Sequence, residues 1–384
     1  MSGEVTLAAV GDVFVDRDLP ASMFQEVAPI LARADLRFGN CEGVYSFQIS
    51  RPPSAAHTIT TDPAHAAVLG EVAFDVMACA NNHFVDGGHQ AMLETLERLR
   101  QQGIATCGAG ADLDQARRPA RLEAAGVGLE VLAYACVHPV GYEARAGVPG
   151  IAGLRALPTY HTDPMFWNPG ALPDVSTHAT AAAFSALQAD VAASRQRSDL
   201  VVVSFHWGDS SLPVKLQDYE VELAHAAVEA GADLILGHHH HCLRGVEIYR
   251  GTPILYGLAS FAFDLPGIDH HFPEAARIKM RERYGDYAFG EREGYPTFPF
   301  HPEYRQTMVV RATLKAGGTA SILLVPCLVQ PAGHPAPLAK GSEEAAKWLD
   351  YMREITRREG FSTRFTDVSW PFDPALTAIQ VEHA

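Results

Sequence analysis

The sequence of 384 residues predicts an α/β protein, and two observations favour this class. Short apolar runs of strand character alternate with amphipathic helical stretches over about 250 residues, as is typical of α/β folds. Polar side chains follow the carboxyl ends of these predicted strands one after another, and open α/β sheets bind their ligands at that edge. The pattern therefore predicts a functional site at the strand ends.

The first part of the chain contains four predicted buried strands. They cover 5–10, 36–38, 74–80 and 128–137. A helix is expected over 89–102, because leucines recur there at helical spacing and Gly103 follows as a terminator.

The middle of the chain interrupts this alternation and then resumes it. Residues 138–178 are rich in glycine, proline, histidine and aromatic residues, and a loop this long in a compact domain is usually functional or disordered. We expect an ordered excursion, because of its aromatic residues. Helices, strands and a hairpin follow. They are predicted at 180–196, 200–205, 217–230, 233–236, 246–249 and 253–256.

The last part of the chain begins with a second irregular stretch at 264–305. An antiparallel strand pair and a final helix follow, at 306–314, 320–327 and 342–358. We expect one domain over 1–335 that includes both excursions. Residues 336–384 are expected to form a helix and a tail packed on it.

Composition and charge restrict the partners. The chain is 47% hydrophobic and 20% charged, with a net charge of −15, so its surface repels nucleic acid and anionic membranes. No stretch approaches the ~18 apolar residues of a membrane span, and no secretory signal is recognisable, so we expect no membrane anchor. The six cysteines form no C-x-x-C pair, which favours reduced thiols in a cytoplasmic protein.

Five polar clusters follow predicted strands. They are Asp12, Asn40 with Glu42, Asn82 with His83, His206, and the run His238–His241. Carboxylates, imidazoles and an amide together suit zinc, manganese or iron. These groups exceed the needs of one four-coordinate ion, so we expect two divalent ions about 3.5–4 Å apart that share a bridging carboxylate.

Each cluster also has a simpler interpretation. Asp12 after a glycine and Asn82 after another asparagine could be turn residues, and His206 could be a hydrogen-bonded core histidine. The four histidines in a row are harder to explain in this way, because buried imidazoles are costly unless they are ligated or hydrogen-bonded. Recurrence at successive strand ends favours the metal site.

Spacing leaves open which histidines of the run act together. Alternate side chains of an extended segment share a face, so His238 could act with His240, or His239 with His241.

Five motifs in order carry a resemblance to a known family: G-D, N-C-E-G, A-N-N-H-F-V-D-G-G, S-F-H-W-G and G-H-H-H-H, followed by PILYGLASFAFD. Over about residues 5–265 the chain resembles the poly-γ-glutamate capsule synthesis (CapA) family, a divergent branch of the calcineurin-like metallophosphoesterases. The resemblance implies a two-sheet αββα sandwich with a dinuclear metal site at the strand carboxyl ends.

The resemblance also implies roles for individual residues. The implied metal ligands are Asp12, Glu42, Asn82, His206, His239 and His241, with Glu42 as the bridging carboxylate. His83 matches the histidine that stabilises or protonates the leaving group. His240 takes the place of a usual proline, and His238 occupies a position where the family tolerates alanine.

The chain departs from ordinary metallophosphoesterases at the first metal site. Their D-x-H motif is replaced by Asp12-Val13-Phe14, so one imidazole is missing, and Asp16 or Asp86 could substitute for it or could be ordinary solvated or capping residues. This weakens the case for phosphatase activity. The absence of an anchor weakens the case for a role in capsule export.

Substrate contacts are expected from residues near these motifs and in the 138–178 excursion. They are Asn40, His138, Tyr142, Arg145 and His238. Arg145 would suit a carboxylate, because a guanidinium binds one in a bidentate manner. The alternative is that 138–178 is only a surface excursion.

Three functions remain open. The first is a metal-dependent hydrolase that uses an activated water on an amide bond of a small, carboxylate-bearing substrate of γ-glutamyl type. The second is a phosphomonoesterase or phosphodiesterase on the same dinuclear site. The third is a non-catalytic metal-containing binding protein linked to polyglutamate capsule biosynthesis. The expected partner is a small molecule or short polymer, and a homo-oligomer stays open.

Overall fold

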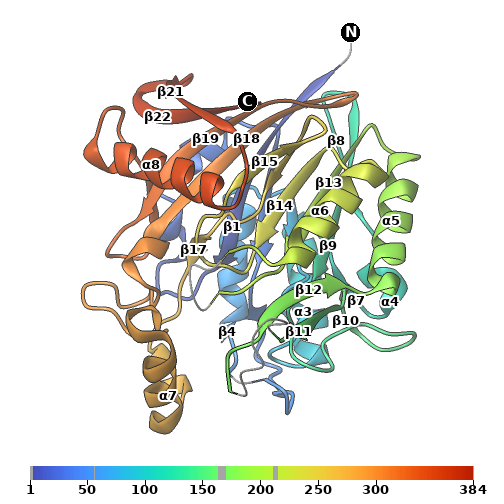
Figure 1. Cartoon of the computed structure of the whole chain (residues 1–384), viewed down its shortest axis with the longest axis vertical. Coiled ribbons are helices and arrows are strands. Elements are labelled where there is room, and N and C mark those ends of the chain that lie inside the picture. Colours follow the sequence, from blue (N-terminus) through green and yellow to red (C-terminus); the bar gives the residue numbers. More distant parts are fainter. Residues whose placement is uncertain (1–2, 56, 163–169, 211–214, 384) are drawn as a thin grey trace.

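The structure is a computed structural model that describes residues 3–55, 57–162, 170–210 and 215–383. Two mixed sheets face each other, with helices on their outer sides (Figure 1). The α/β class predicted from the alternation of strands and helices is confirmed.

The larger sheet has the order β21-β22-β19-β18-β1-β2-β5-β6, with β17 also paired to β1 and β20 to β19. Its strands are β1 (Glu4–Phe14), β2 (Leu36–Cys41), β5 (Val76–Ala78), β6 (Ala105–Cys107), β17 (Ser260–Phe263), β18 (Gln306–Lys315), β19 (Gly318–Val329), β20 (Pro335–Pro337), β21 (Arg364–Trp370) and β22 (Asp373–Glu382). Strands β1, β2, β5, β6 and β17 are parallel, so their carboxyl ends lie at one edge.

The smaller sheet has the order β15-β16-β14-β13-β9-β8. Its strands are β8 (Ala120–Ala124), β9 (Val127–Ala135), β13 (Leu200–His206), β14 (Leu234–His238), β15 (Val246–Tyr249) and β16 (Thr252–Leu255). The central four strands are parallel. Three short pairs complete the strands: β3 (Val44–Tyr45) with β4 (Thr60–Thr61), β7 (Ala109–Gly110) with β10 (Gly150–Ile151), and β11 (Ala156–His161) with β12 (Asp174–Ala179).

The helices are α1 (Ala28–Leu31), α2 (Ala67–Glu71), α3 (His89–Gln101), α4 (Leu113–Ala116), α5 (Ala181–Arg195), α6 (Asp218–Ala230), α7 (Glu274–Tyr284) and α8 (Glu343–Arg358). Short 3-10 turns cover Pro20–Met23, Pro63–Ala66, Ile268–His271, Gly285–Tyr287 and Pro302–Arg305. Helix α6 begins with a capping box between Gln217 and Glu220 and ends at Gly231, whose φ is 116°.

Strand β13 shows how the two cores form. Successive side chains of a strand point to opposite faces. Leu200 and Val202 join the core between the sheets, whereas Val201 and Val203 join a second core beneath α5 and α6. A strand covered on both faces reads as the continuous apolar run seen in the sequence.

Two regions differ from the sequence prediction. The tail expected after the final helix forms β21 and β22, which extend the larger sheet through the pairing of β22 with β19. The irregular 264–305 stretch contains α7, which has no buried residue and therefore no apolar stripe that would predict it.

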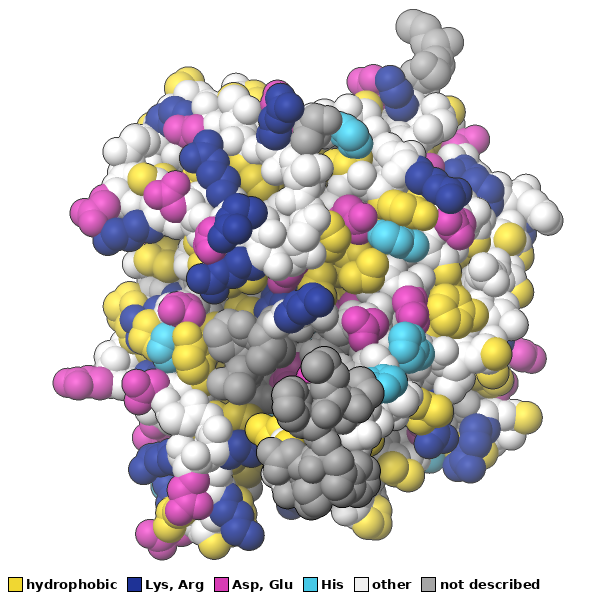
Figure 2. All heavy atoms as spheres, in the orientation of Figure 1, with side chains coloured by type: hydrophobic (Ala, Val, Ile, Leu, Met, Phe, Trp, Pro, Cys, Tyr) yellow, Lys and Arg dark blue, Asp and Glu magenta, His cyan; other side chains and the backbone are white. Residues whose placement is uncertain are grey.

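All six cysteines lie within the described residues and none forms a disulfide. Among the described helices, none combines the length and apolarity needed to span a bilayer. On the face shown in Figure 2, Lys and Arg side chains are interspersed with Asp and Glu side chains.

Candidate metal centre

The carboxyl ends of strands from both sheets meet at one edge of the sandwich. In the larger sheet, the register places Asp12 opposite both Asn40 on β2 and Ser260 on β17. In the smaller sheet, His206 on β13 lies opposite His238 on β14. The parallel registers therefore bring the polar clusters of the sequence together.

The glycines of the G-D and G-H motifs are required by close backbone packing. A Cβ on Gly11 would lie 1.8 Å from the carbonyl oxygen of Ala259, and one on Gly237 would lie 2.0 Å from that of Tyr256. No side chain fits at either position. Each glycine lets the next residue enter the site while a neighbouring strand passes directly behind it.

Glu42 lies at the centre of the site. It belongs to two groups whose ligand atoms lie within 4.8 Å of one another: Glu42 with His206 and His239, and Glu42 with Asp12 and His241. Its Oε1 lies 3.5 Å from His206 Nε2 and 3.9 Å from His241 Nε2. One carboxylate therefore belongs to both groups of candidate ligands.

The buried oxygens of the site fit a divalent cation. Both Glu42 oxygens and Asp12 Oδ2 are buried without a hydrogen-bond partner among the described residues. Buried carboxylates without partners are costly unless they are paired or coordinate a metal. The donor set of carboxylates, imidazoles and an amide matches zinc, manganese or iron. The buried His/Asp/Glu groups are therefore consistent with metal binding.

The pKa values of the Asp12 and Glu42 carboxyl groups are shifted in opposite directions. Burial alone would raise the pKa of Asp12, but the rings of His238 and His241, each with Nδ1 3.3 Å from an Asp12 oxygen, hold this pKa well below its usual value. Burial, followed by the negative charge of Asp12, raises the pKa of Glu42 well above its usual value. A cation beside Glu42 would favour its charged form.

Asn82 joins the first of these groups. Its Oδ1 lies 2.5 Å from His206 Nε2, and His206 in turn lies 3.1 Å from His239 Nδ1. The neighbouring Asn81 has a structural role, because its amide donates to the carbonyl of Cys41 and its Oδ1 accepts from the His83 amide. The structure thus brings all six predicted ligands together. They are Asp12, Glu42, Asn82, His206, His239 and His241.

The four histidines of the run point to three different places. His239 and His241 have positive φ values of 89° and 54°, and both rings belong to the metal-ligating groups. His238 is buried, with its Nδ1 3.3 Å from Asp12 Oδ1. His240 points away, and its Nε2 lies 2.9 Å from Glu220 Oε2 on α6. The pairing of His239 with His241 comes from a strained turn, not from extended backbone.

The group of Glu42, Asp12 and His241 has Phe14 where D-x-H proteins have a histidine ligand. Phe14 is buried against Tyr45 and Phe263 in the core. Asp16 instead accepts a hydrogen bond from Thr61, and Asp86 lies beside His83. Neither aspartate belongs to the two groups around Glu42.

His83 is held by a buried relay of side chains. Its Nδ1 lies 2.7 Å from Asp86 Oδ2, and Asp86 Oδ1 accepts a hydrogen bond from the Tyr142 hydroxyl at 2.7 Å. Asp86 also accepts from the backbone amide of Ile59. This arrangement fixes the orientation of the His83 ring and directs its other nitrogen away from Asp86.

The predicted substrate contacts are placed differently. Asn40 and His238 are almost fully buried behind Asp12, with the Asn40 amide donating to Asp12 Oδ1 at 2.9 Å. The Tyr142 hydroxyl is used by Asp86. His138 is partly buried beside Pro139, and Arg145 is exposed. None of these five residues lines the pocket beside the metal centre, because they support its base or lie outside it.

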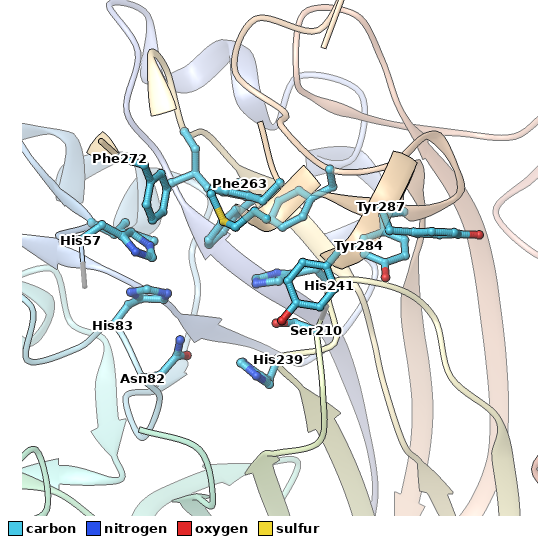
Figure 3. Close-up of a pocket in the computed structure, with 16 residues that line it drawn as sticks. His57, Asn82, His83, Ser210, His239, His241, Phe263, Phe272, Tyr284 and Tyr287 are labelled. Carbon is cyan, nitrogen blue, oxygen red and sulfur yellow. The ribbon is translucent and has the colours of Figure 1, made fainter. Parts of the chain in front are cut away.

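That pocket has a volume of about 280 Å³ and opens over the metal centre. His83, Asn82, His239 and His241 form its polar side, as Figure 3 shows. Its other walls are largely aromatic and aliphatic residues of the 264–305 segment together with His57. Sequence analysis missed these residues, although the abundance of Phe and Tyr in that segment was a usable signal.

Comparisons with known proteins identify relatives of the chain. The model of the bacterial capsule synthesis protein family, PGA_cap, matches residues 6–265. The chain is similar to the PGA biosynthesis protein CapA of Bacillus subtilis, with 28% identity over 95% of this chain and 81% of that protein. It is also similar to the capsule biosynthesis protein CapA of Bacillus anthracis, with 26% identity over 68% and 60%.

Among solved structures, a provisionally named 5′-nucleotidase from Staphylococcus aureus aligns with 91% of this chain and 58% of that chain. The sequence identity is 11% and the TM-score 0.44, so this likeness carries no argument about activity. The family match spans all five strand-end motifs. The chain belongs to the bacterial capsule synthesis protein family PGA_cap, as the CapA resemblance predicted.

Proposed function

We propose that this protein is a metal-dependent hydrolase that cleaves an amide bond of a small molecule. The observation that carries the proposal is the bridging position of Glu42 between two groups of buried ligands, beside a pocket that also contains His83. Divalent ions at such a centre supply an acidified water as nucleophile and a Lewis acid that polarises the substrate.

In this proposal, some side chains hold the metal ions and others position those ligands. Glu42, His206 and His239 would hold one ion, and Glu42, Asp12 and His241 the other, with Asn82 beside the first. His238 and Asn40 position Asp12 from behind.

His83 has the position of a proton donor. Asp86 accepts from His83 Nδ1 and holds the ring, so the opposite nitrogen can carry a proton to a departing amine. The Tyr142 hydroxyl keeps Asp86 in place. Amide hydrolysis needs such a donor, because an amine leaves poorly without a proton.

The pocket supports an amide over a phosphoester. Its described lining contains no Lys or Arg, so the metal ions alone would have to balance the charge of a phosphoester, whereas a neutral amide needs no such balance. The loss of an imidazole at Phe14 also separates the site from the phosphatase pattern. The carboxylate expected on the substrate gains no support, because Arg145 lies exposed outside this lining.

The test compares chromogenic substrates on protein loaded with Mn²⁺, Zn²⁺ or Fe²⁺. We expect turnover of 4-nitroacetanilide or γ-glutamyl-4-nitroanilide that is abolished by EDTA and by His239→Ala. Faster turnover of p-nitrophenyl phosphate or bis-p-nitrophenyl phosphate, also lost in His239→Ala, would overturn the amide assignment. Metal binding without turnover of any substrate would favour a binding protein.

A further inference from the structure

We propose that the pocket beside the metal centre binds an aromatic ring carried by the leaving group of the substrate. This inference rests on the proposed hydrolase function and narrows its substrate class to aryl or arylmethyl amides. Figure 3 shows the pocket between His83 on one side and Tyr284 on the other.

The walls of the pocket contain aromatic rings that contact one another. A bound aromatic ring could make contacts of the same kind with them. Phe289 lies 5.1 Å from Phe300 at an interplanar angle of 60°, and 6.2 Å from Phe272 at 86°. Phe300 also lies 4.4 Å from the ligand His241. Edge-to-face contacts at these separations favour an aromatic occupant beyond its apolar area.

The same wall reaches the proton donor. The ring of His57 lies between His83, at 5.0 Å, and Phe272, at 4.9 Å. Burial lowers the pKa of His57 to about 3, so this imidazole is neutral and the pocket wall stays uncharged there. A ring bound against His57 would therefore place its attached nitrogen near His83, which is the leaving-group side of the reaction.

The size and lining of the pocket favour a compact ring as the occupant. A volume of about 280 Å³ lies at the lower end of the range of small-molecule sites. Beyond the metal ligands and His83, the described lining is mostly aromatic and aliphatic and contains no Lys or Arg, so this wall offers no ion-pair partner to an anionic group. An uncharged ring suits it.

Helix α7 forms the outer wall and makes the inference testable. The helix projects from the body of the molecule (Figure 1) and has no buried residue, yet Met280 and Tyr284, one turn apart, line the pocket. Ile278 on the same helix is 49% exposed and does not line it. Truncations in α7 can therefore change the pocket without unfolding the core.

The experiment measures binding to the full-length, metal-free protein by ligand-observed NMR titration. The probes are N-benzylacetamide, N-(cyclohexylmethyl)acetamide and N-ethylacetamide. We expect N-benzylacetamide to bind at least tenfold more tightly than the other two. Tyr284→Ala and Met280→Ala should each weaken it by about three- to tenfold, while the matched Ile278→Ala changes nothing.

Three results would overturn the inference. They are equal binding of the cyclohexyl and benzyl probes, equal binding of the ethyl probe, or an effect of Ile278→Ala as large as that of Met280→Ala. The binding measurement needs no turnover. Binding of the aromatic ring without hydrolysis would therefore support the inference about the pocket and contradict the proposed hydrolase function. If N-ethylacetamide were hydrolysed as fast as N-benzylacetamide, the hydrolase function would be supported and the inference about the aromatic ring would be contradicted.

Discussion

Asp12 and His206 lie at the ends of long buried strands, whereas Met280 and Tyr284 belong to a helix with no buried residue. These two regions, the metal centre and the aromatic pocket, adjoin each other but tolerate change very differently. The metal centre depends on parallel registers and on glycines that no other residue can replace. The pocket depends on side chains of an irregular segment, so its walls can vary while the chemistry beneath them stays the same.

The largest expected effect comes from breaking the metal centre. His206→Ala removes a ring that lies close to Glu42, Asn82 and His239. We expect activity to fall by more than about 100-fold, because even residues that only support metal ligands contribute about 10–100-fold. The matched control is His225→Ala, a partly exposed histidine of α6 that pairs with Glu247. Comparable losses in both variants, measured as kcat/KM, would contradict the assignment.

A smaller effect separates proton transfer from metal binding. Asp86→Asn removes the carboxylate that orients His83, so we expect about a 100-fold loss of kcat with unchanged metal content. The loss should be greater for substrates with basic leaving groups. Asp75→Asn, which alters an ion pair with Arg37 elsewhere, serves as the control. A loss of metal in Asp86→Asn would make Asp86 part of the metal centre instead.

The sequence signals for the candidate metal centre are local and repeated. Asp12, Glu42 and His206 each follow a run of buried strand residues, and parallel strands bring such positions to one edge. The family resemblance selected His239 and His241, whereas periodicity could not, because positive φ values replace the extended backbone that it assumes.

The aromatic pocket could not be assembled from sequence for a physical reason. Its walls come from α7 and the turns around it, where no hydrophobic period exists. Its contacts with His57 join residues more than 200 positions apart. Likewise, the placement of Asn40 and His238 behind Asp12 depends on the packing of the two sheets, which spacing along the chain does not encode.

The mildest prediction concerns His240 and its partner. Burial raises the pKa of Glu220 to about 8, above that of an unfolded glutamate. A raised pKa in the folded state contributes stability that is complete below about pH 4.5 and is lost as the pH rises through about 8. Glu220→Gln should therefore flatten the fall in melting temperature between pH 6 and 9 by several degrees, measured by circular dichroism. An identical fall in both proteins would show that Glu220 does not titrate in this range.

The bridging role of Glu42 is the central claim, and metal content tests it most directly. The protein is loaded with Mn²⁺ or Zn²⁺, freed of excess metal and analysed by mass spectrometry, beside Glu42→Ala and the control Glu94→Ala. We expect two equivalents per chain in the wild type and in Glu94→Ala, and at most one in Glu42→Ala, because both ligand groups share this carboxylate. No bound metal in the wild type, or two equivalents in Glu42→Ala, would contradict the dinuclear centre.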